Sequence, residues 1–163
     1  LFLYDQLGST NPNAVLSVIY YSAEHLGCQH FVVDSLMKCS INEDDYNGQK
    51  KFVDQLCIAA RDLNIHIHLV AHSRKTIDET THTPSKFDVA GSATITNLAD
   101  NCVSVYRNKK KEKDIMEGKL SEEDAKIVPD GFMSVNKQRH FEWEGSIPLW
   151  FQPKSLRYRD KPI

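Results

Sequence analysis

The sequence has few of the features that define several large classes of protein. No stretch of its 163 residues approaches the run of about 20 apolar residues that a membrane-spanning helix requires. None of its four cysteines forms a CxxC pair, which excludes a disulfide-dense secreted scaffold and predicts reduced thiols in a cytosol-like compartment. The net charge of −2 excludes a uniformly basic surface that wraps nucleic acid, so any contact with phosphate groups must be local.

The two common glycine-rich phosphate-binding patterns are also absent. Neither GxxxxGK[ST] nor GxGxxG occurs, and the single Gly-Lys pair, Gly118-Lys119, is followed by Leu120. A complete nucleotide site therefore cannot be assembled from these residues alone. The chain also lacks an initiator Met and opens in an apolar run, so we expect a fragment of a longer polypeptide.

The first 71 residues alternate between two kinds of apolar pattern. Short apolar runs, typical of buried strands, occur at 1–4, 31–34 and 65–71. Amphipathic stretches typical of helices lie between them, the first from Pro12 to Leu26 with Asn11 as its cap and Gly27 after its end, the second over 52–63. This order predicts an α/β fold with a largely parallel sheet flanked by helices, and with its ligand-binding loops at one edge.

The remaining residues predict a different arrangement. A short helix is expected at 92–99 and a strand at 102–106. The highly charged stretch 108–130 predicts a surface excursion that is partly helical between Glu122 and Ile127. Strand-like runs at 132–136 and 149–151 predict antiparallel closing strands, and we interpret 1–163 as one domain.

An apolar strand that ends in an aspartate, FVVDS at 31–35, is the first candidate for chemistry. A rigid strand end can hold the Asp34 carboxylate where it binds the water shell of Mg²⁺ beside a nucleotide, which is the Walker B arrangement. Many strands of α/β proteins end in Asp for a simpler reason, because the side chain caps the next helix. Both interpretations stay open on the sequence.

Three histidines share one parity in IHIHLVAHSRK at 65–75. His66, His68 and His72 would point to one face of a strand, which is compatible with a metal site if further ligands such as Asp34 contribute. The alternative for His66 and His68 is a pair of half-buried, hydrogen-bonded rings. His72 differs because it falls at the strand end, where an imidazole can donate a hydrogen bond to a phosphate oxygen.

Two further groups of cations are candidates for phosphate contacts. The loop that begins at Ser73 contains Arg74, Lys75 and Lys86, and can approach a nucleic-acid backbone unless it is an ordinary solvated loop. In KQRHF at 137–141, Lys137 and Arg139 are two residues apart and project to one side if the strand continues. Such a pair can neutralise charge on a phosphoryl group in transfer, although exposed pairs on edge strands are common.

Taken in order, four segments resemble the later motifs of DnaB-type hexameric replicative helicases, closest to the branch of phage helicase–primases and the mitochondrial Twinkle helicase. The segments are FVVDS, LVAHSRK, VAGSATITNLADNCVSVYRN and SVNKQRHFEWEGSIPLWFQPKSLRY. The resemblance implies a RecA-like P-loop NTPase core, and rings, most often hexamers, that translocate on single-stranded DNA and unwind duplexes. It implies ATP and Mg²⁺ as cofactors, a P-loop and catalytic Glu upstream of Leu1, and a location in the cytoplasm, a host cytoplasm or the mitochondrial matrix.

The same resemblance implies roles for the candidate residues. Asp34 would act on Mg²⁺ through water, and His72 would couple the γ-phosphate to a central-channel loop. That loop would bring Arg74, Lys75 and Lys86 near DNA. Lys137 and Arg139 would enter the site of the adjacent subunit, Arg139 as the arginine finger, so that the isolated fragment would not hydrolyse ATP.

Three other functions remain compatible with the residues. The first is a RecA-like ATPase or recombinase without unwinding activity. The second is a nucleic-acid-binding or assembly module that hydrolyses nothing. The third is a metal-dependent hydrolase that uses His66, His68 and His72.

Overall fold

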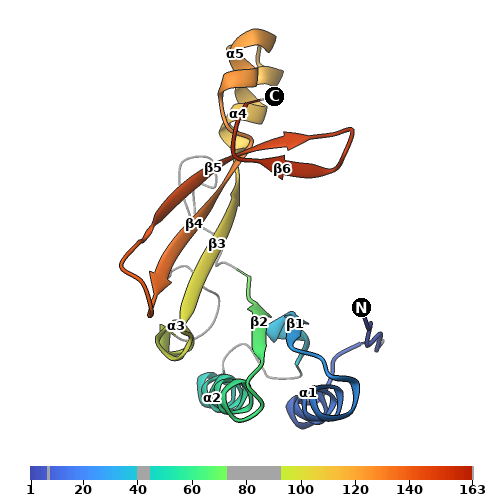
Figure 1. The fold of residues 1–163 in the computed structure, drawn as a ribbon. Coiled ribbons are helices and arrows are strands. Elements are labelled where there is room, and N and C mark those ends of the chain that lie inside the picture. Colours follow the sequence, from blue (N-terminus) through green and yellow to red (C-terminus); the bar gives the residue numbers. More distant parts are fainter. Residues whose placement is uncertain (7, 40–44, 73–92, 163) are drawn as a thin grey trace. The chain divides into compact units, whose positions relative to one another are not determined.

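The computed structural model describes residues 1–6, 8–39, 45–72 and 93–162. The chain is a mixed α/β protein with a two-stranded parallel sheet and a four-stranded antiparallel sheet (Figure 1). It divides into two compact units, the first formed by 1–73 and 89–99 and the second by 74–88 and 100–163. Among the helices that the structure describes, none is long and apolar enough to cross a membrane.

The first unit begins with α1, which spans Pro12–Leu26. The Asn11 side chain accepts a hydrogen bond of 2.8 Å from the Asn13 amide, Pro12 occupies the first helical position, and Gly27 ends the helix at φ 64°. These are the three end signals on which the sequence prediction of this helix depended, and the prediction is confirmed. The strand expected at residues 1–4 is wrong: this segment pairs with no described strand and its side chains are exposed. Apolar residues alone do not make a strand, because the backbone N–H and C=O groups of a strand need hydrogen-bond partners on a neighbouring strand.

The remaining elements of the first unit alternate between strand and helix. They are β1 (His30–Asp34), the 3₁₀ turn η1 (Leu36–Lys38), α2 (Tyr46–Asp62), β2 (His66–Val70) and α3 (Ala93–Leu98). The helix α2 begins earlier than the apolar spacing predicted, because Asp45 caps it by accepting a hydrogen bond from the Gly48 amide. The predictions of both strands, both longer helices and the short helix are therefore confirmed.

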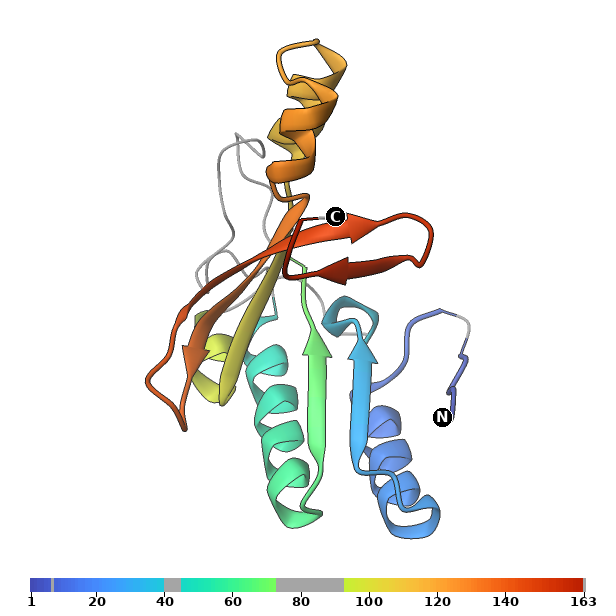
Figure 2. The same cartoon turned by 45° about the horizontal axis from the view of Figure 1, so that its top comes forward.

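The strands β1 and β2 are parallel, with His30 opposite His66 and Asp34 opposite Val70. Burial alternates along both strands, so that Phe31, Val33, Ile67 and Leu69 face the core while their neighbours are exposed. The core itself is formed by α1, the η1 segment, α2 and α3 against this inner face, and its buried members are Ile19, Leu36, Cys39, Phe52, Val53, Leu56 and Ile95. Figure 2 shows the parallel pair beside α1 and α2. Within the described residues only this pair is parallel, so the expectation of a largely parallel sheet holds only here.

The second unit is built on an antiparallel sheet of order β3-β4-β5-β6. Its strands are β3 (Asn101–Arg107), β4 (Gly131–Gln138), β5 (Gly145–Gln152) and β6 (Arg157–Arg159). The expected antiparallel closing strands are thus confirmed, and they extend beyond the predicted bounds because each is paired along its length. The charged excursion contains two helices, α4 (Lys109–Met116) and α5 (Glu122–Ile127), the second at the predicted position.

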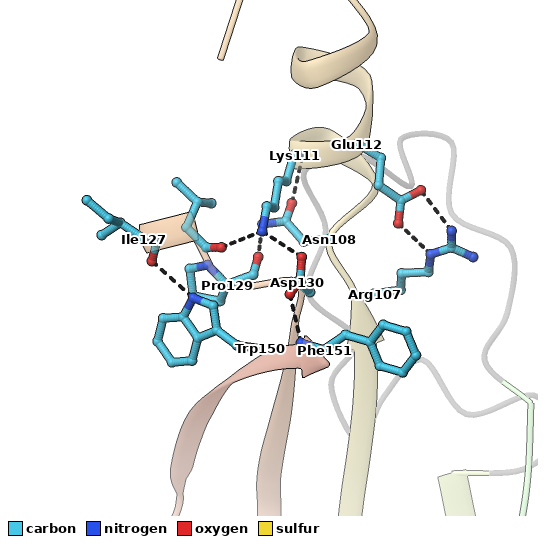
Figure 3. A network of polar contacts seen from close by, with 10 residues as sticks. Arg107, Asn108, Lys111, Glu112, Ile127, Pro129, Asp130, Trp150 and Phe151 are labelled. Carbon is cyan, nitrogen blue, oxygen red and sulfur yellow. Dashed lines mark hydrogen bonds and ion pairs between the residues drawn. The ribbon is translucent and has the colours of Figure 1, made fainter. Parts of the chain in front are cut away.

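The excursion is fixed to the sheet by polar contacts around Lys111 (Figure 3). The Lys111 ammonium is buried and donates hydrogen bonds to Asp130 Oδ1 at 2.6 Å and to the Val128 carbonyl at 2.7 Å. Asp130 Oδ2 in turn accepts from the Phe151 amide of β5 at 2.7 Å. The Trp150 indole donates to the Ile127 carbonyl at 3.2 Å. Although most of its charges are exposed, the excursion is therefore an anchored part of the second unit.

Candidate functional site

The carboxyl ends of β1 and β2 bring the two main candidate residues to one edge of the parallel pair. Asp34 is the last residue of β1 and lies opposite Val70, the last residue of β2. His72 follows Val70 by two residues, and both Asp34 and His72 are exposed. Because the strands are parallel, a carboxylate and an imidazole leave the sheet at the same edge, where α/β folds bind ligands.

The alternative role of Asp34 as a helix cap is not the one observed. The residue at the cap of η1 is Ser35, and the cap of the next helix, α2, is Asp45. The exposed carboxylate of Asp34 is thus available for an outer-sphere contact with a hydrated cation, for which oxygen ligands are suited. The burial of neighbouring Phe31 and Val33 against the core fixes the strand that carries it.

The cationic pair belongs to the second unit. Lys137 lies on β4 opposite Cys102 and is partly buried, whereas Arg139 follows the end of β4 and is half exposed. The Arg139 amide still donates to the Asp100 carbonyl at 3.0 Å, so the backbone pairing extends past the strand. The Arg139 guanidinium donates to Asp100 Oδ1 at 2.7 Å, in an ion pair whose two side chains are each about half exposed.

An exposed ion pair of this kind contributes only about 0–1 kcal/mol to stability, so its loss costs little. The pair with Asp100 by itself therefore does little to hold the Arg139 guanidinium away from another anion, such as a phosphate. The sequence analysis missed Asp100, which is separated from Arg139 by 39 residues and meets it only through the β3–β4 register. Arg74, Lys75 and Lys86, predicted to contact DNA, lie outside the described residues, as does the loop that holds them.

Three imidazoles gather on the outer face of the parallel pair, which we call the histidine face: His30, His66 and His68. The common orientation predicted for His66 and His68 is confirmed, and both residues are exposed. His30 was missed because only the parallel register brings it opposite His66. His72 lies beyond the end of the strand.

The histidines of this face influence one another electrostatically. Partial burial, followed by the neighbouring His66 and His30, lowers the pKa of His68 below its usual value, since each effect disfavours the charged ring. In the conformation described, no group of three or more His, Cys, Asp or Glu side chains within the described ranges is arranged to share a metal ion. The three histidines named in the sequence analysis therefore do not form a preformed metal centre.

Comparisons with known proteins gave no match, either in a scan against models of protein families or in a search of curated proteins. Support for the roles of the candidate residues therefore comes from their motifs and from the geometry of the parallel pair. In that geometry the carboxyl edge of the parallel pair, with Asp34 and His72, is the arrangement that most directly suggests chemistry on a phosphate–metal complex.

Proposed function

We propose that this chain is part of the motor of an ATP-driven replicative DNA helicase of the DnaB type, with a RecA-like core. The observation that carries the proposal is the shared edge of Asp34 and His72 at the carboxyl ends of two parallel strands. A Walker B carboxylate and a γ-phosphate sensor both need positions at that edge, because the nucleotide binds where the strand ends converge. The order of the four motif segments, two of which contain these residues, gives further support.

Each cofactor in this proposal has a residue suited to it. Asp34 offers an exposed carboxylate that would hold the water shell of Mg²⁺, and the metal would neutralise charge on the phosphates of ATP. His72 would donate a hydrogen bond to the γ-phosphate and so distinguish ATP from ADP. The P-loop, which these 163 residues lack, would be supplied by sequence preceding Leu1.

The partners in the proposal are single-stranded DNA and further copies of the same protein in a ring, most often a hexamer. Arg139 would act in trans, on the nucleotide of the adjacent subunit, after exchanging Asp100 for a γ-phosphate oxygen. Lys137 would assist as a second cation. Arg74, Lys75 and Lys86 would contact the phosphate backbone of DNA, which makes binding dependent on salt.

The proposal predicts that Arg139→Ala in the full-length protein lowers the ATPase turnover by about 10³-fold or more while ATP binding is retained. The matched control is Arg159→Ala, which removes another exposed arginine of the second unit and should leave turnover within a few-fold of wild type. Normal turnover in the Arg139 variant would refute the assignment.

A mixing experiment tests whether Arg139 acts in trans. Subunits with Asp34→Ala and subunits with Arg139→Ala are each expected to be inactive alone, because every site lacks one of the two groups. When mixed, a ring places intact Asp34 beside intact Arg139 at some interfaces, so ATPase activity should reappear. Activity that never exceeds that of the separate variants would argue against shared sites.

Unwinding of a forked DNA duplex then distinguishes a helicase from a RecA-like ATPase or recombinase without unwinding activity.

A further inference from the structure

The spacing of the three rings on the histidine face is close to that of imidazoles bound to one metal ion. The ring centroids of His66 and His68 are 4.3 Å apart, those of His30 and His66 5.7 Å, and those of His30 and His68 6.2 Å. With zinc–nitrogen bonds of about 2.1 Å and tetrahedral angles, two imidazoles on one ion have centroids about 5 Å apart. The observed separations scatter about this value by about 1 Å.

We propose that the histidine face binds one divalent transition-metal ion of the kind that imidazole prefers, such as Zn²⁺, with His30, His66 and His68 as its protein ligands. His66 and His68 form an HxH pair on β2, and the parallel register brings His30 of β1 beside them. Imidazole nitrogen suits Zn²⁺, Cu²⁺ and Ni²⁺. Three protein ligands leave a fourth position, which water would occupy.

The proposed site requires the three side chains to rotate. As they stand, no three His, Cys, Asp or Glu side chains of the described residues are placed to hold a metal ion. All three histidines are exposed, and exposed side chains change rotamer within nanoseconds, so the free energy of metal binding has little strain to overcome. The strand backbones need not move, since Phe31 and Ile67 on the opposite face are packed against the core of the first unit.

This site is distinct from the one in the proposed function and does not depend on it. The metal ligands lie on the outer face along the strands, whereas Asp34 and His72 lie at or beyond their carboxyl ends. The ligand set also differs from the one considered from the sequence, because His30 replaces His72. A transition-metal ion at this position would cross-link β1 and β2 and add to the stability of the first unit.

Isothermal titration of the tag-free 163-residue protein with Zn²⁺ tests the proposal. We expect one ion per chain, and a loss of affinity of at least about 10- to 100-fold in each of His30→Ala, His66→Ala and His68→Ala. The matched control is His25→Ala, which removes an exposed histidine of α1 in the same unit and should leave affinity unchanged. A second control, Cys28→Ser, removes the thiol that precedes β1 and should also leave binding intact.

Substitution with Co²⁺ provides a readout of coordination itself. Bound Co²⁺ should show the strong visible absorption of a four-coordinate ion, and this absorption should be lost in His68→Ala while far-UV circular dichroism remains that of the wild type. The proposal is overturned if Zn²⁺ does not bind, if the three histidine variants bind as tightly as the wild type, or if only Cys28→Ser abolishes binding. None of these outcomes bears on ATPase activity, so the two proposals can fail separately.

Discussion

Replacement of Lys111 by Met should destabilise the second unit far more than loss of an ordinary surface lysine. The Lys111 side chain is only 8% exposed, and its ammonium contacts Asp130 Oδ1 at 2.6 Å and the Val128 carbonyl at 2.7 Å. Removing one partner of a buried ion pair costs about 3–5 kcal/mol, chiefly because the other charge is left unpaired. Asp130 is 34% exposed and keeps its hydrogen bond from the Phe151 amide, so we expect about 2–3 kcal/mol for Lys111→Met.

The matched control is Lys119→Met, in the loop after α4. Lys119 pairs with Glu117 Oε2 at 2.5 Å, but the two side chains are 65% and 38% exposed. Such a pair contributes about 0–1 kcal/mol, and its loss should be close to the limit of detection. Met preserves most of the apolar stem in both variants, so the comparison isolates the charged group and its surroundings.

Urea unfolding monitored by tryptophan fluorescence measures this effect in the correct unit. The chain has two tryptophans, Trp143 and Trp150, and both belong to the second unit. Trp150 donates to the Ile127 carbonyl, so its emission also reports the docking of the excursion. For Lys111→Met the unfolding midpoint should fall by about 1–2 M urea. Equal midpoints for the Lys111 and Lys119 variants would refute the reasoning.

A double-mutant cycle makes the prediction sharper. Asp130→Asn in the wild-type background removes the anion that pairs with Lys111 and should destabilise the unit. In the Lys111→Met background the same change removes an unpaired charge while an amide oxygen can still accept from the Phe151 amide, so it should stabilise the unit. An effect of equal size and sign in both backgrounds would show that the charges are not coupled.

Two further predictions concern buried positions. In Gly131→Ala the new Cβ would lie 2.6 Å from the Tyr106 carbonyl oxygen, so β3 and β4 must separate locally, and tryptophan-monitored unfolding should show a loss of stability of about 1–3 kcal/mol. The control Gly118→Asn, at φ 68° with open space, should change the stability little, and an equal loss in both variants would contradict the reasoning. Burial raises the pKa of the Cys39 thiol, so the fold favours the protonated form. The contribution of the protonated Cys39 thiol to stability is therefore complete at neutral pH and is lost as the pH rises beyond about 9. Urea midpoints measured by circular dichroism should fall less steeply with alkaline pH in Cys39→Ala than in the wild type. Parallel pH profiles of the two proteins would count against this prediction.

Most of the secondary structure was predictable because its signals are local. The cap at Asn11, the left-handed Gly27 and the alternation of FVVD each depend on neighbouring residues, and all of them give the predicted elements. The segment 1–4 shows the limit of this reasoning. Its apolar residues resemble a strand, but whether they form one depends on a partner that local sequence does not specify.

The candidate site was predictable only in part for the same reason. Asp34 and His72 follow apolar runs, so the sequence alone indicated that each would stand at a strand end. The alternation of strands and helices also predicted the parallel pairing that puts them at a common edge. The register of β1 with β2, which brings His30 beside His66, was not predictable from the sequence.

The amino-acid sequence by itself determined most of the helices and strands, the segment 1–4 excepted, and which chemical groups each strand presents. Only the tertiary structure decided which groups meet across long separations: Arg139 with Asp100, Lys111 with Asp130, and His30 with His66 and His68. The physical reason is that helix caps and alternation act over a few residues, whereas strand register depends on packing of the whole element against its neighbours.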